Sequence, residues 1–327
     1  MERPTVGIDL GASYTKVAYR SPLKRYGQNK FAEMKTEVAL IDGSAMIPSL
    51  MIRTGDQRRP WITGADAAGT NPDGKMELFE NWKSALYSSE FDAHKVRLVM
   101  VAGHFFGWLS DRLNGCGVDF GDNCRVRVTI PGLKRIEDRK DALIECMRLN
   151  GWPNHIEVVI EPVANLVGFL SGGRNLVTAL GKMNYWLTIG DADGTVQHEF
   201  RYVFDEMRKF ALRNRTGRNM TISVVDLGSF TLDVAKMTLD LKVSEYEQFP
   251  VDEIFEESWE IGIIDDLDKP CLSNIFSSYG IDGGRLSFVV RELAKIELYA
   301  GREFAVPGTR AVLGRSESDK EIVNSTI

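Results

Sequence analysis

The chain of 327 residues is long enough for about two domains, and its apolar fraction of 43% is typical of a folded protein. The formal net charge of -6 and the pI near 5.5 give no general attraction to nucleic acid or anionic lipid. Charged residues interrupt every apolar run well before the length of a membrane helix, about 20 residues, and the N-terminus carries no signal-peptide pattern. The cysteines and histidines show no metal-binding spacing, so a zinc site has little support. We therefore expect a cytoplasmic protein with no nucleic-acid or membrane partner.

The first half of the chain alternates between strands and helices. In chain order, the pattern first predicts strands at about 5–8, 16–19 and 37–41, then a short helix at 64–68 and a long helix at 95–114. A strand at 125–130, a helix at 136–150, a strand at 157–160 and a helix at 163–170 follow. Within 95–114, the side chains of Val101, Phe105 and Leu109 share one helix face, which should be core. Strands and helices in this alternation predict an α/β fold.

One short motif occurs twice. The segments 6–19 and 224–235 each run from an apolar strand through Asp-Leu-Gly and a hydroxyl-rich turn into a second strand. A glycine after an acidic residue leaves backbone N–H groups free to face an anion, and the aspartate can hold a hydrated cation. A single Asp-Leu-Gly is also an ordinary hairpin turn, but two copies with the same flanking strands predict a pair of loops that clamp a nucleotide's phosphates. Neither a Walker-type loop nor a Gly-x-Gly-x-x-Gly turn is evident, which disfavours other nucleotide folds.

Further motifs follow in a fixed order along the chain: Pro48-Ser49, 64–68, Asn71-Pro72, 128–131, Gly151-Trp152 and 160–165. Together with the two Asp-Leu-Gly segments, they resemble the nucleotide-binding domain of the seventy-kilodalton heat-shock chaperones (DnaK type), within the actin, sugar-kinase and chaperone superfamily. The resemblance implies a two-lobed actin-like ATPase fold, with ribonuclease H-like mixed sheets, flanking helices and a cleft between the lobes. We expect lobes at 1–171 and 172–327, with a hinge near 170–173.

The resemblance also implies site residues. Asp9 and Asp226 would hold a hydrated Mg²⁺ under the phosphates of ATP or ADP, largely through water. Asp226, Thr231 and Asp233 would take part in hydrolysis, the last two by placing the attacking water. The residues implied to contact the nucleotide are Gly11, Ala12, Ser13, Tyr14, Thr15, Gly228, Ser229 and Lys295.

Two further catalytic residues are implied by the same resemblance. Lys83, in the segment after the Asn-Pro turn, would stabilise charge on the transferred phosphoryl group, or could be one more solvated lysine. Glu161 would orient metal-bound water, or could be a helix-start carboxylate that favours the helix dipole.

The chain departs from this family in several places. Ser229 and Phe230 stand where the second phosphate motif is normally richer in glycine, and about 174–220 looks like an insertion. The Gly-Gly-rich adenosine motif is absent, and 306–327 looks short, polar and tail-like. These departures predict either a fragment of a longer protein or reduced nucleotide binding.

Three functions remain open from the sequence. The first is a slow Mg²⁺-dependent ATPase that couples nucleotide state to lobe closure and to protein partners or clients. The second is a noncatalytic nucleotide-sensing or interaction module of the same fold. The third is an actin-like filament protein, and a sugar kinase is a weaker fourth possibility.

Overall fold

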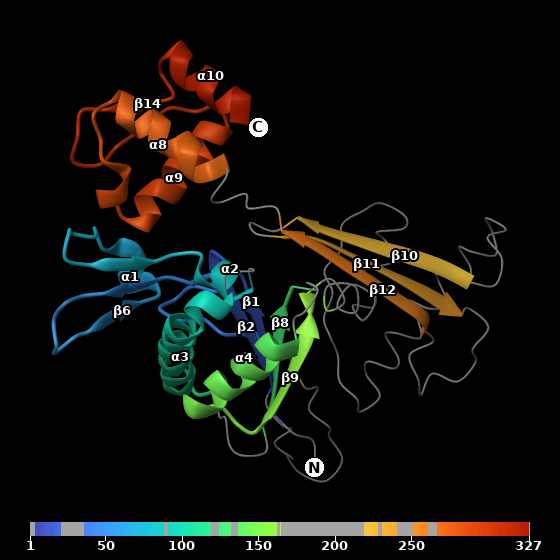
Figure 1. The fold of residues 1–327 in the computed structure, drawn as a ribbon. Coiled ribbons are helices and arrows are strands. Elements are labelled where there is room, and N and C mark those ends of the chain that lie inside the picture. Colours follow the sequence, from blue (N-terminus) through green and yellow to red (C-terminus); the bar gives the residue numbers. More distant parts are fainter. Residues whose placement is uncertain are drawn as a thin grey trace, which may run out of the picture.

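The computed structural model describes residues 4–20, 36–87, 91–118, 124–131, 137–161, 164, 219–227, 231–240, 251–260 and 267–326. Within these ranges, sheets alternate with flanking helices, so the predicted α/β class is confirmed (Figure 1). None of the helices in these ranges is long and apolar enough to cross a membrane.

The first sheet contains both antiparallel and parallel strands. It is built from β1 (Thr5–Leu10), β2 (Tyr14–Arg20), β3 (Thr36–Val38), β4 (Ile47–Pro48), β8 (Arg125–Ile130) and β9 (His155–Ile160). The strand order is β3-β2-β1-β8-β9, with β4 paired to β2. β1 pairs antiparallel to β2 and parallel to β8, and β8 pairs parallel to β9. This antiparallel hairpin continued by parallel strands is the mixed sheet expected from the sequence.

Two helices cover one face of this sheet (Figure 1). They are α3 (Phe91–Gly115), which begins slightly before the predicted start, and α4 (Glu137–Leu149). Val101, Phe105 and Leu109 of α3 are fully buried, so the predicted core face is confirmed. The core also contains the inward-facing residues of β1 and β8, as alternation along half-buried strands requires.

A small antiparallel sheet extends from the first. It consists of β5 (Met51–Arg53), β6 (Trp61–Thr63) and β7 (Glu77–Phe79), and the helices α1 (Ala65–Gly69) and α2 (Trp82–Tyr87) follow β6 and β7. The predicted short helix at 64–68 is therefore confirmed as α1. Gly64 precedes it with a φ of 67°, and a Cβ there would lie 2.4 Å from the ring of Trp108. Only glycine satisfies both the left-handed backbone and this close approach.

The second Asp-Leu-Gly motif lies in a second antiparallel sheet, formed by β10 (Asn219–Leu227), β11 (Thr231–Asp240) and β12 (Val251–Glu260). The two hairpins have the same register. Asp9 pairs with Lys16 and Leu10 with Thr15, while Asp226 pairs with Asp233 and Leu227 with Leu232. The sequence repeat is thus a repeat of backbone geometry. The predicted helix at 163–170, the hinge at 170–173 and the insertion at 174–220 lie outside the described residues, apart from Ala164 and the final two positions of the insertion, and the lobe boundary stays a prediction.

The C-terminal segment forms a compact unit, so the prediction of a polar tail over 306–327 is wrong. The unit contains α8 (Lys269–Ser278), η2 (Gly283–Arg285), α9 (Phe288–Tyr299), β13 (Phe304–Ala305), β14 (Val312–Leu313) and α10 (Glu317–Thr326). Val306, Leu313 and Val323 are buried against α8 and α9. These apolar residues are too widely spaced to form a local pattern, and they become core only through contacts with helices earlier in the chain. The unit lies beside the small sheet, where α9 packs on α1 (Figure 1).

Candidate functional site

The first phosphate-loop candidate, residues 11–15, is held by Ser49. The Ser49 hydroxyl donates to the Gly11 carbonyl at 2.8 Å and shares a hydrogen bond with the Thr15 hydroxyl, also at 2.8 Å. Its backbone N–H donates to the Ser13 carbonyl at 2.9 Å. A Cβ on Gly11 would lie 2.2 Å from the Tyr14 carbonyl oxygen, so this turn requires glycine. The side chain of Thr15 is committed to holding the loop, and its main chain lies between β1 and β4, opposite Leu10 and Ile47.

Asp9 lies at the end of β1, beside this loop, with its side chain half exposed. The Thr129 hydroxyl donates to one carboxylate oxygen at 3.4 Å, and the Lys16 ammonium lies 3.4 Å from the other. The sequence reasoning missed Lys16. The signal was its position seven residues after Asp9, because the hairpin register makes the two residues direct neighbours across the strands.

Lys83 and Glu161 form a buried ion pair. Lys83 lies in the first turn of α2, and Glu161 follows β9 directly, so residues 78 positions apart are joined. Their side chains are only 5% and 14% exposed. Lys83 is therefore not a solvated lysine, and Glu161 is engaged with a cation as well as lying at a strand end.

Glu161 is also close to other predicted site residues. Burial raises the pKa of the Glu161 carboxyl above its usual value, the charge of Lys83 and its hydrogen bond oppose this, and the negative charges of Asp233 and Asp9 raise it further. Glu161 therefore lies within electrostatic range of Lys83, Asp9 and Asp233, which come from distant parts of the sequence. We call these four residues the Glu161 cluster.

The second hairpin contributes a hydroxyl to the same place. The Thr231 hydroxyl donates to an oxygen of Asp233 at 2.5 Å, and both residues are buried. Asp226 is the cross-strand partner of Asp233 and is partly buried. Gly228 and Ser229, predicted to contact the nucleotide, lie outside the described residues.

Lys295, predicted to contact the base or ribose, lies on α9 near the first loop. Its ammonium is 3.1 Å from Asp268 and 3.0 Å from Glu292. The pKa of the Tyr14 hydroxyl is raised, first by burial and then by the charge of Glu292, while Lys295 opposes the rise. The Tyr14 ring also meets Phe288 edge to face, with centroids 5.9 Å apart. One face of α9 therefore packs against the first phosphate-loop candidate.

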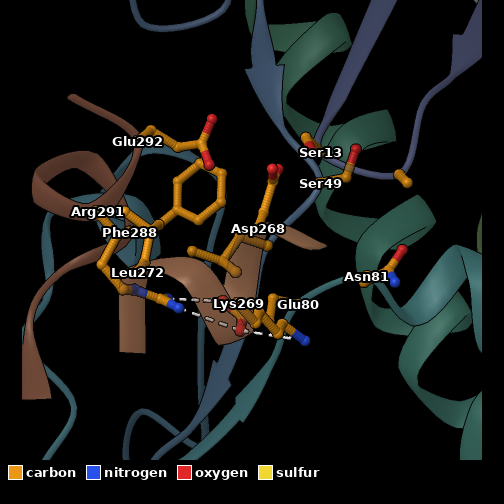
Figure 2. A pocket seen from close by; sticks show the side chains of 12 residues that line it. Ser13, Ser49, Glu80, Asn81, Asp268, Lys269, Leu272, Phe288, Arg291 and Glu292 are labelled. Carbon is orange, nitrogen blue, oxygen red and sulfur yellow. Dashed lines mark hydrogen bonds and ion pairs between the residues drawn. The ribbon is translucent and has the colours of Figure 1, made fainter. Parts of the chain in front are cut away.

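A pocket lies between this loop and the C-terminal unit (Figure 2). Ala12, Ser13 and Ser49 line one wall, and Glu80 and Asn81 lie beside it. The other wall is formed by α8, α9 and the residue before α8, through Asp268, Lys269, Leu272, Phe288, Arg291 and Glu292. The cavity volume is about 40 Å³, which admits water but is far below the roughly 300 Å³ of a small ligand pocket. In this conformation the pocket is closed to a nucleotide.

The predicted magnesium ligands fit that metal in their chemistry. No group of three His, Cys, Asp or Glu side chains within metal-binding reach occurs in the part of the chain that the structure describes. Mg²⁺ does not require such a group, because it keeps several waters and binds through one or two carboxylates together with substrate phosphates. Asp9, half exposed at the loop, and Asp226, at the matching position of the second hairpin, supply oxygen donors of this kind.

Comparison with known proteins gives only distant structural likenesses. No protein-family model matches the chain, and no curated protein matches it. Among solved structures, it is similar to a chain of a 15-stranded ParM filament from Clostridium botulinum, with 11% identity, coverage of 99% of this chain and 80% of that chain, and a TM-score of 0.48. It is also similar to the Aquifex aeolicus PPX-GPPA enzyme, with 9% identity, coverage of 91% and 62%, and a TM-score of 0.32. These values assign no activity, and the α/β assignment depends on the strand order and registers given above.

Proposed function

We propose that this chain binds ATP or ADP with Mg²⁺ between its two matched hairpins and hydrolyses ATP slowly. The observation that carries the proposal is the meeting of Asp9, Lys83, Glu161 and Asp233 beside the hairpin turns. Burial of the Lys83–Glu161 pair is costly for stability alone, because each buried charge loses its hydration, and the charges of Asp233 and Asp9 add to the cost of an ionised Glu161. A carboxyl group with a raised pKa beside phosphate-loop candidates, as at Glu161, is typical of a functional site.

Each residue of the cluster would have its own role in phosphoryl transfer. Lys83, held in one position by Glu161, would place a fixed positive charge against the charge that develops on the transferred phosphoryl group. Thr231 and Asp233, hydrogen bonded to one another, would hold the attacking water, since the hydroxyl oxygen can still accept a hydrogen bond. Mg²⁺, bound near Asp9 and Asp226, would neutralise phosphate charge. Lys16, the neighbour of Asp9, would exchange its carboxylate partner for a phosphate oxygen.

The finer proposal is that nucleotide state controls closure between lobes and hence the binding of a protein partner or client. It is supported by the motif resemblance to the seventy-kilodalton heat-shock chaperones. The noncatalytic alternative differs in one respect, since it keeps nucleotide binding and lacks turnover.

Single-turnover hydrolysis distinguishes these alternatives. Excess protein is mixed with labelled ATP and Mg²⁺, and phosphate release is compared for the parent, Lys83→Met and the control Lys75→Met, which removes an exposed lysine. We expect slow release by the parent and the control, and a loss of about a hundredfold or more in Lys83→Met, the scale of a lost transition-state contact. Bound ATP with no phosphate release by the parent would support the noncatalytic module instead.

A further inference from the structure

An ion-pair cluster spans the pocket from the N-terminal part of the chain to the C-terminal unit. Glu80, at the end of β7, accepts two hydrogen bonds from the guanidinium of Arg291 on α9, at 2.6 and 3.2 Å. The Lys269 ammonium of α8 lies 3.6 Å from the same carboxylate. Figure 2 shows these interactions among the residues that line the pocket. The contact thus fastens both helices that form the second wall of the pocket.

The charges of Glu80 and Arg291 are largely removed from water. The side chains of Glu80 and Arg291 are 19% and 16% exposed. Burial alone would raise the pKa of Glu80, but the hydrogen bonds and charge of Arg291, with the charge of Lys269, outweigh burial and lower it. Loss of Glu80 would leave Arg291 buried and uncompensated, and loss of Arg291 would leave Glu80 with Lys269 alone, so the contact resists opening.

The guanidinium of Arg291 is nevertheless not fully satisfied. Its Nε is buried, and none of the residues that the structure describes accepts a hydrogen bond from it. A buried donor without a partner costs free energy, so the closed arrangement is less favourable than its two good hydrogen bonds suggest. The bidentate ion pair stabilises the closed arrangement, and the unsatisfied Nε destabilises it. This combination suits a contact that keeps α9 in place and can still open.

The position of Glu80 connects this contact to the rest of the site. Asn81 follows it with a φ of 55°, in the left-handed region, and turns the chain sharply. The next residue, Trp82, donates from its indole N–H to the Ser49 carbonyl at 2.9 Å, and Lys83 then pairs with Glu161. The segment 80–83 therefore connects three features of the site: the ion pair at the pocket through Glu80, the loop-holding Ser49 through Trp82, and the buried ion pair through Lys83.

We propose that the Glu80–Arg291 ion pair is a latch that holds α8 and α9 over the phosphate loop and limits how fast a nucleoside di- or triphosphate enters and leaves. The proposal rests on the proposed nucleotide function. The cavity of about 40 Å³ is too small for a nucleoside, so a nucleotide whose base lies between the loop and α9 requires α9 to move away from the loop. The latch carries charge on both sides of the opening, and its rupture therefore sets a barrier to entry and release alike.

Stopped-flow fluorescence with a labelled ADP and Mg²⁺ tests the latch through rates. Three variants are compared with the parent: Glu80→Gln, the charge exchange Glu80→Arg with Arg291→Glu, and Glu77→Gln as a control. Glu77 lies on the same strand and pairs with Arg97 on the exposed surface. We expect Glu80→Gln to raise the association and dissociation rates together, by about tenfold, while the equilibrium affinity changes less. The charge exchange should return both rates toward those of the parent, and Glu77→Gln should leave them unchanged.

Rates in Glu80→Gln within about twofold of the parent, with nucleotide still bound, would overturn the latch and leave the proposed function standing. Absence of nucleotide binding by the parent would overturn the proposed function. Hydrogen–deuterium exchange without nucleotide then decides whether the contact holds the helices. The latch predicts faster exchange across 288–299 in Glu80→Gln, with unchanged exchange in β1 and β8. Unchanged exchange across 288–299 would refute it.

Discussion

The buried pair of Lys83 and Glu161 allows a quantitative test of the site's energetics. Two unit charges in hydrogen-bonding contact, about 3 Å apart, attract by about 5 kcal/mol at an effective dielectric constant of about 20. Each ion also loses several kcal/mol of hydration on burial, so the pair as a whole contributes little net stability. Removal of one partner is different, because it keeps the desolvation cost of the other. We therefore expect strong coupling between the two residues.

The perturbation is a double-mutant cycle of Lys83→Met, Glu161→Gln and both together. Lys83→Met leaves Glu161 ionised near Asp233 and Asp9, and should reduce the free energy of unfolding by about 3–5 kcal/mol. Glu161→Gln should cost less, because an amide oxygen can still accept from Lys83 and the repulsion by the two aspartates is lost. The double variant should lie within about 1–2 kcal/mol of the parent. The coupling energy is then at least about 1 kcal/mol, and about 2 kcal/mol or more if Glu161→Gln itself costs about 1 kcal/mol.

Urea unfolding followed by circular dichroism measures these differences at neutral pH, with unchanged slopes as the check that the unfolding transition is comparable. Lowering the pH should restore part of the free energy of unfolding that Lys83→Met loses. Without the lysine, the folded-state pKa of Glu161 rises further, so its uptake of a proton restores stability as the pH falls toward and below that value. A cost below about 1 kcal/mol for Lys83→Met, with additive effects in the double variant, would refute the inference of a buried, coupled pair.

Three further tests address other parts of the account. Gly11→Ala should abolish nucleotide binding, because its Cβ would lie 2.2 Å from the Tyr14 carbonyl oxygen. The control Gly74→Ala should keep its equilibrium binding, because the added Cβ meets no described atom within 4 Å. Equal binding by both variants would contradict the requirement for glycine in the turn at Gly11. Val323→Ala should lower the free energy of unfolding by about 1–3 kcal/mol, because the side chain of Val323 is in the core. Val289→Ala should cost little, because the side chain of Val289 is 44% exposed. Equal losses of stability in thermal or urea unfolding would argue against a folded C-terminal unit. For the filament alternative, light scattering should rise with ATP above a critical protein concentration, and a flat signal over a wide concentration range would exclude it under those conditions.

The sequence predicted local structure well where a pattern repeats within a short segment. The hairpins around Asp9 and Asp226 were evident from two similar motifs, and the structure gives them one register. Lys83 and Glu161 came from the family resemblance alone, because nothing in their local sequence shows that they meet. Lys16 was missed, since its relation to Asp9 depends on strand register.

The C-terminal part was predicted least well for a physical reason. Leu313 and Val323 belong to very short apolar runs, Ala311-Val312-Leu313 and Ile322-Val323, and only their packing against α8 and α9 makes them core residues. The Glu80–Arg291 contact joins positions 211 residues apart, and charged residues are common on any surface. A single sequence offers no means of choosing that pair among the many other charges.

The central claim is that the two hairpins together hold a magnesium-bound nucleotide. Isothermal titration with ATP, with and without Mg²⁺, tests it most directly in the parent, Asp9→Asn, Asp226→Asn and the exposed control Asp73→Asn. The account predicts Mg²⁺-dependent binding by the parent and the control, and a loss of about tenfold or more in each of the other two variants, or about 1.4 kcal/mol. Binding by the parent that does not depend on Mg²⁺, or that is unchanged by both substitutions, would contradict it.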